Sequence, residues 1–193
     1  MTMTTFPPEV ASAVSAVVAG AGALDLSSAT PCADFDLKAL INHVIGTTAA
    51  LARVGRREPL DPTDPYGEHT DASGGDWQGQ LASNLDGLAQ AWAEPQAWEG
   101  SVDMASQTMP APMIGEMALA EVVLHGWDLA RATGQRLVIE EHTAAELRRS
   151  VEATAELGRQ MSAYGPAVEV APDASDFDRA LAASGRDPDW TAG

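Results

Sequence analysis

Residues 121–128 read Glu-Val-Val-Leu-His-Gly-Trp-Asp, and they lie within an apolar segment, 113–133, that has the periodicity of an α-helix. At about 100° per residue, Glu121, His125 and Asp128 fall on one face of this helix. The same face carries apolar side chains and should therefore point into the core: Ile114, Met117, Ala118, Leu129 and Ala132. Burying three ionisable groups without partners would cost several kcal/mol each. The pattern therefore predicts a compensating partner, and one metal ion is the simplest candidate.

The spacing of these residues suits a metal site. Because Glu121 and His125 are four residues apart, both side chains can reach one ion from a single helical turn. His43, at the edge of the apolar stripe of another predicted helix, supplies a further ligand. Two histidines and one carboxylate are the ligands of catalytic zinc and of facial-triad iron, which both leave open positions. Asp128 lies one turn beyond His125, where it could orient the imidazole or bind the ion weakly.

Alternative interpretations of these residues stay open at this point. The buried Glu-His-Asp cluster could be a hydrogen-bonded core network that holds no metal. Cys32 could act as a soft ligand, although a single cysteine more often fills apolar space. Arg131 could pair with Asp128 or contact an anionic substrate, or it could simply be solvated. His69 and His142 are expected to be solvated, because one lies in a loop rich in Pro, Asp and Gly and the other beside two glutamates.

Amphipathic segments recur along the chain and predict an all-α fold with little strand. The first helix should begin near Pro7 and the second after a cap at Asp34 or Asp36. The remaining helices are expected at about 76–93, 113–133, 143–164 and 175–183. The segment 98–112 could be a short hairpin or a crossover loop. Neither a repeat nor an interdomain linker interrupts the pattern, so we expect one domain over residues 1–193.

Composition narrows the possible partners. The 193 residues include 28 acidic and 11 basic side chains, a formal net charge of −17. This charge disfavours nucleic acid and anionic membranes as partners. No apolar run is long enough to span a bilayer, and the N-terminal segment lacks the basic region of a signal peptide. A single cysteine, Cys32, excludes an intrachain disulfide and suits a reducing cytoplasm, which is the localisation we expect. Sequence motifs for nucleotide hydrolysis, serine hydrolysis and thiol–disulfide exchange are also missing.

Two stretches carry a family resemblance. The first comprises Thr30-Pro31-Cys32-Ala33-Asp34-Phe35-Asp36-Leu37 followed by Asn42-His43-Val44, and the second is the segment from Glu121 to Gly134. The tail from Tyr164-Gly165-Pro166 to Gly185-Arg186-Asp187-Pro188 adds a weaker match. These three stretches, in this order along the chain, resemble those of the actinobacterial metal-binding proteins of the DinB-like superfamily. Among the characterised members that the chain resembles are the mycothiol-dependent maleylpyruvate isomerases, through their N-terminal domain.

The resemblance implies an up-down-down-up four-helix bundle with an extra C-terminal tail, and a divalent metal at His43, Glu121 and His125. We expect zinc, which accepts this ligand set without redox chemistry, with nickel, manganese or iron as alternatives. The resemblance also implies an enzyme that uses a small thiol such as mycothiol, as an S-transferase or isomerase. The isomerases carry an additional C-terminal domain for which we expect no room in this chain, which argues against maleylpyruvate isomerase activity itself. Related proteins are linked to small thiols such as mycothiol and bacillithiol, and this link suggests thiol S-transfer. A metal-dependent hydrolase and a non-enzymatic, metal-stabilised binding protein are the alternatives. A homodimer paired through helices is a further expectation.

Overall fold

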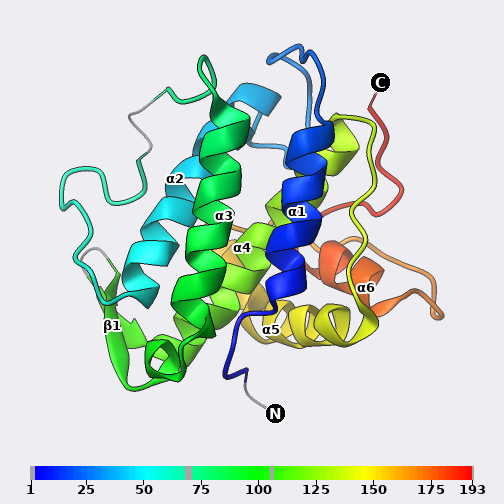
Figure 1. Ribbon diagram of the computed structural model, residues 1–193. Coiled ribbons are helices and arrows are strands. Elements are labelled where there is room, and N and C mark those ends of the chain that lie inside the picture. The colour runs from blue at the N-terminus through cyan, green and yellow to red at the C-terminus, as the bar shows by residue number, and fades with distance from the viewer. Residues whose placement is uncertain (1–2, 68–70, 105–106, 193) are drawn as a thin grey trace. The chain divides into compact units, whose positions relative to one another are not determined.

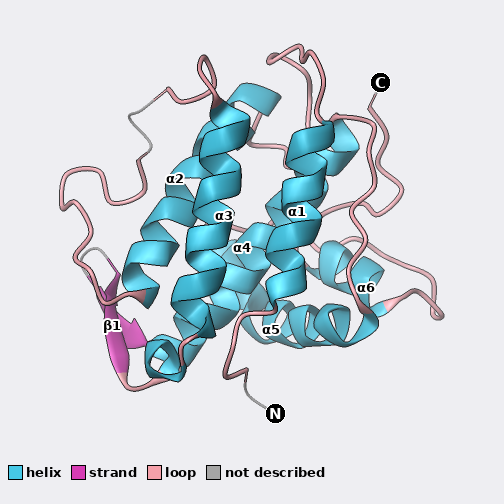
Figure 2. Cartoon of the chain, in the orientation of Figure 1, coloured by secondary structure: helices cyan, strands magenta, loops and turns pink. Residues whose placement is uncertain are grey.

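The computed structural model describes residues 3–67, 71–104 and 107–192. Its contacts divide the chain into two compact units, one ending at Leu137 and the other beginning at Val138. Helices dominate both units (Figure 1; Figure 2). Each unit is described by itself below, and the expected single-domain organisation over residues 1–193 stays a prediction.

Four helices form the first unit: α1 (Pro8–Gly20), α2 (Leu37–Gly55), α3 (Trp77–Ala93) and α4 (Ala111–Ala132). α1 packs against α3 and α4, and α2 packs against the same two helices, so the four close into a bundle. α1 and α4 run in one direction and α2 and α3 in the other, as the colour gradient of Figure 1 shows. The predicted all-α fold with up-down-down-up order is therefore confirmed.

The helix boundaries follow from local chemistry. The side chain of Asp36 accepts a hydrogen bond from the backbone N–H of Ala39 at 2.8 Å, so Asp36 rather than Asp34 caps α2. Asp76 caps α3 in the same way through Gly79 at 3.0 Å. α4 starts directly after Pro110 and ends before Gly134, whose φ of 69° suits a glycine. The core between the helices holds large, fully buried side chains, among them Leu40, Ile41, Leu51, Leu81, Leu85, Leu88, Trp92, Ile114 and Leu119.

The connection between α3 and α4 contains the only strands among the described residues. A short 3₁₀ helix, η1 (Pro95–Trp98), leads into β1 (Ser101–Met104), which pairs antiparallel with β2 (Gln107–Pro110). Of the two alternatives for 98–112, the structure therefore has the hairpin. Arg57, which follows α2 in a left-handed conformation, donates hydrogen bonds to the carbonyl oxygens of Gln96 and Ser101 and so links α2 to this connection.

The long connection between α2 and α3 passes directly over α2. Because these two helices run in the same direction, the chain must return along the whole bundle before α3 can begin. The carbonyl oxygen of Tyr66 lies so close to Gly46 that a Cβ atom there would be 1.8 Å from it. Further along, the side-chain oxygen of Asn42 accepts hydrogen bonds from the backbone N–H groups of Ala72 and Ser73, at 2.9 and 3.1 Å. Both contacts fasten the connection to the helix that carries His43.

The second unit contains α5 (Glu141–Gln160) and α6 (Asp176–Ala183), which pack against each other. An ion pair of 2.7 Å joins Arg148 to Asp176 across the two helices. α5 ends four residues before the predicted boundary at Tyr164, because the chain turns at Ser162, where φ is 58°. Among the described residues of either unit, no helix is long and apolar enough to cross a membrane.

Candidate metal centre

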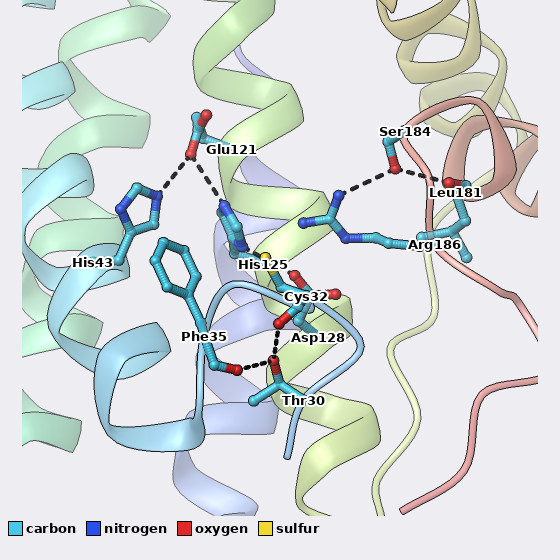
Figure 3. Close-up of polar contacts among 10 residues, drawn as sticks. All are labelled: Thr30, Cys32, Phe35, His43, Glu121, His125, Asp128, Leu181, Ser184 and Arg186. Carbon is cyan, nitrogen blue, oxygen red and sulfur yellow. Dashed lines mark hydrogen bonds and ion pairs between the residues drawn. The ribbon is translucent and has the colours of Figure 1, made fainter. Parts of the chain in front are cut away.

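α2 and α4 bring the predicted ligands together. His43 projects from α2, while Glu121 and His125 project from successive turns of α4, which packs against α2 (Figure 3). One ligand atom from each of the three residues lies within 4.8 Å of the others. All three side chains retain some access to solvent: 24% for His43, 26% for Glu121 and 11% for His125. Helical spacing alone explains the pair on α4, whereas His43 needs the packing of two helices.

The distances within this cluster suit an ion better than hydrogen bonds. Oε2 of Glu121 lies 3.3 Å from Nε2 of His43 and 3.4 Å from Nε2 of His125. Nitrogen–oxygen hydrogen bonds are usually about 2.9–3.0 Å long, so both contacts are long for direct bonds. Nitrogen and oxygen ligands bound tetrahedrally to zinc lie about 3.3–3.5 Å apart, given the usual metal–ligand bond lengths. The three residues therefore fit a divalent ion in both ligand type and spacing.

Asp128 fixes the orientation of one imidazole. Its carboxylate has no exposed surface, and Oδ2 lies 2.9 Å from Nδ1 of His125. A proton on Nδ1 that bonds to this carboxylate leaves Nε2 of a neutral imidazole with its lone pair outward. That lone pair faces the carboxylate of Glu121, and two acceptors repel each other unless a proton or a cation lies between them. A carboxylate–histidine pair beside a metal is the usual arrangement around histidine ligands.

A loop between α1 and α2 closes one side of the cluster. Cys32 lies with His125 and Asp128, forming a second group whose ligand atoms are within 4.8 Å of one another. The hydroxyl of buried Thr30 shapes the loop, because it lies 3.0 Å from the carbonyl oxygen of Cys32 and 2.8 Å from that of Phe35. The ring of Phe35 rests against both histidines, with ring centres 4.9 Å from His43 and 6.0 Å from His125.

Phe35 is the site residue that sequence reasoning missed. It belongs to the first stretch that carries the resemblance, but it precedes α2 and has no place in a helical pattern. Its position depends on the fold of the loop, which periodicity does not describe. An aromatic residue directly before the capping Asp36 was the one available signal.

Two further candidate residues have contacts of their own. His142 is exposed, as predicted, and its imidazole is 3.9 Å from the carboxylate of Glu140. Arg131 has its guanidinium 5.8 Å from the ring centre of Trp127, a cation–π contact on α4. His69 falls outside the described residues.

Known structures share this fold. The mycothiol-dependent maleylpyruvate isomerase superposes with a TM-score of 0.56 at 20% sequence identity, over 81% of this chain and 75% of the isomerase chain. A histidine-to-alanine mutant of the same enzyme gives a TM-score of 0.56 at 19% identity and the same coverage. The bundle is therefore the DinB-like fold of that enzyme, as the resemblance implied.

Sequence comparisons give the same relationship. An uncharacterized protein of Mycobacterium tuberculosis, recorded from two strains, is 26% identical over 156 residues, or 79% of this chain and 78% of the relative. The family model of the mycothiol maleylpyruvate isomerase N-terminal domain matches residues 8–130, which contain all four helices of the first unit up to Ala130. With well over half of its length matched, the chain belongs to the mycothiol maleylpyruvate isomerase N-terminal domain family.

Proposed function

We propose that this protein binds one divalent metal ion through His43, Glu121 and His125 and acts as an enzyme that uses a low-molecular-weight thiol of the mycothiol type. The observation that carries the proposal is the convergence of two Nε2 atoms on one carboxylate oxygen, at 3.3 and 3.4 Å. The family supports the thiol, because its named member depends on mycothiol. Transfer of the thiol sulfur, or isomerisation of a thiol adduct, is the reaction class.

Zinc is the ion that we propose, because it accepts two imidazoles and one carboxylate and needs no redox partner. Nickel, manganese and iron can bind the same ligands, and the metal supply often decides which ion is present. When bound, the ion would supply a Lewis acid that lowers the pKa of a coordinating thiol or water. Three protein ligands are typical of catalytic zinc sites, whereas structural zinc sites usually have four.

The protein's own residues would prepare this centre. Asp128 holds the imidazole of His125 through Nδ1 and keeps Nε2 directed towards Glu121. The partial exposure of His43 and Glu121 leaves a path for a small molecule. Phe35 covers the histidines on the side away from Glu121 in the view of Figure 3. A thiol would therefore approach beside Glu121 rather than through the loop.

A thiol titration of the cobalt-substituted protein tests this proposal. Adding mycothiol or a simple alkyl thiol should produce a sulfur-to-cobalt charge-transfer band and release a proton, because the thiolate is the ligand. Both signals should vanish in Glu121→Ala if this carboxylate holds the ion. Cys32→Ser must behave like the wild type, since the chain's own thiol could otherwise supply the band. No spectral change with any thiol, while cobalt stays bound, would reject thiol use and favour the hydrolase or the binding protein.

Removal of the metal separates catalysis from a structural role. If the ion serves folding, as in a metal-stabilised binding protein, chelation should unfold the bundle. We expect the apoprotein to keep its helical circular dichroism, because the bundle has a large apolar core of its own. Loss of the helical signal on chelation, and its return with zinc, would favour the structural role.

A further inference from the structure

The two histidines of the cluster differ in what holds them. Nδ1 of His125 is bonded to the buried carboxylate of Asp128. His43 has contacts with Glu121, Phe35 and His125, but within the described part of the chain its Nδ1 atom has no protein hydrogen-bond partner. A histidine ligand nearly always donates its second ring N–H to a fixed acceptor, which sets the tautomer and the ring orientation. His43 therefore lacks the usual protein group that would orient it.

The ring of Phe35 packs against the ring of His43. Its ring centre is 4.9 Å from that of His43 and the two planes are inclined by 35°, so the aromatic surface lies along the imidazole. The centre of the same ring is 6.0 Å from the ring centre of His125, and the two imidazole rings are arranged edge to face with their centres 4.8 Å apart. One aromatic ring thus contacts both histidines, which come from different helices. Figure 3 shows it next to them, across from Glu121.

The backbone of Phe35 is fixed on both sides. Its N–H donates to the carbonyl oxygen of Cys32 at 3.0 Å, and its carbonyl oxygen accepts from the hydroxyl of Thr30 at 2.8 Å. The ends of the loop are tied together by a hydrogen bond of 2.9 Å from the N–H of Leu37 to the carbonyl oxygen of Ser28. A ring attached to such a backbone is a firm support for its neighbours.

The χ2 torsion of histidine is broad and roughly twofold, so an unsupported imidazole can flip and exchange the positions of its two nitrogens. We propose that Phe35 is a positioning residue that sets the orientation of His43 by ring packing, in place of a hydrogen bond to Nδ1. This inference rests on the metal site of the proposed function, but not on the use of a thiol. Phe35 does not bind the ion; it keeps Nε2 of His43 directed at Glu121.

The test compares Phe35→Leu, which removes the flat ring, with Phe35→Tyr, which keeps it. Phe6→Leu is the matched control, since Phe6 is a buried core residue that lies just before α1 rather than α2. Zinc affinity is measured by competition with a chromophoric chelator, and the cobalt visible spectrum reports the coordination geometry. Phe35→Leu should weaken zinc binding about tenfold, as loss of an orienting neighbour does, and should alter the cobalt spectrum. Phe35→Tyr and Phe6→Leu should match the wild type in both.

A second readout is nuclear magnetic resonance of labelled histidines. In the metal-free wild type, this measurement requires neither a folded variant nor a bound metal. The ring protons of His43 should show contacts with the ring of Phe35 and one set of shifted resonances. In Phe35→Leu, the resonances of His43 should average while those of His125, held by Asp128, should not. Averaged resonances of His43 in the wild type, or unchanged zinc affinity and cobalt spectrum in Phe35→Leu, would overturn the inference. A wild type that binds no metal would refute the proposed function instead, and the imidazole resonances would still decide the role of Phe35.

Discussion

Oδ2 of Asp128 lies 2.9 Å from Nδ1 of His125, the residue one helical turn earlier on α4, and Asp128 has no exposed surface. A buried carboxylate is tolerated only when charged or polar partners compensate for its lost hydration. One such partner, His125, is itself a candidate metal ligand, so the cost of burial is linked to the orientation of one imidazole. This relationship separates the cluster from an incidental group of surface acids.

Asp128→Asn tests that role. The amide keeps the size and one acceptor oxygen but loses the charge, so we expect zinc affinity to fall about 10- to 100-fold, in the range seen for partners of histidine ligands. The control is Asp103→Asn, because Asp103 is exposed on β1 and accepts a hydrogen bond from Thr108. Competition with a chelator measures both affinities. Equal affinity in Asp128→Asn and the wild type would show that the buried charge does not serve the site.

Glu121→Gln should abolish stable metal binding. The substitution removes the one carboxylate that both Nε2 atoms face and leaves two neutral ligands. Elemental analysis of the purified protein should give about one metal ion per chain in the wild type and close to none in the variant. Glu116→Gln, on the same helix but outside the cluster, should keep the full metal content. Retention of the ion in Glu121→Gln would remove this residue from the ligand set.

The sequence was informative where the chemistry is periodic. Glu121, His125 and Asp128 share one face of α4 by spacing alone, and the apolar face of α2 predicted the helix that carries His43. Phe35 could not be predicted, because its contacts depend on a loop closed by hydrogen bonds of Thr30 and Leu37. The path of the α2–α3 connection could not be predicted either, since it depends on contacts between residues far apart in sequence.

Asp71 anchors this connection, and its titration can be followed directly. The ion pair with Lys38 at 2.7 Å, helped by hydrogen bonds from Ser73 and Asn42, holds the pKa of the Asp71 carboxyl well below its usual range. A lowered pKa in the folded state means that the stabilisation is present above pH ~3.9, the usual pKa of aspartate, and is lost as the pH falls towards the folded value. Side-chain carboxyl resonances should show a depressed midpoint for Asp71. Lys38→Met should raise it, and a midpoint unaffected by this change would contradict the assigned cause.

Gly46→Ala should destabilise the protein, because a Cβ atom there would lie 1.8 Å from the carbonyl oxygen of Tyr66. That oxygen belongs to the backbone, so either α2 or the connection must shift, and overpacking of this kind costs about 1–3 kcal/mol. Gly87→Ala is the matched control: it lies within α3, and its nearest neighbour would be the side chain of Arg56 at 3.9 Å. Since alanine favours helix, that variant should gain about 0.5–1 kcal/mol. Urea unfolding followed by circular dichroism measures both changes, and a Gly46→Ala protein as stable as the wild type would show that the connection does not press on α2 in solution.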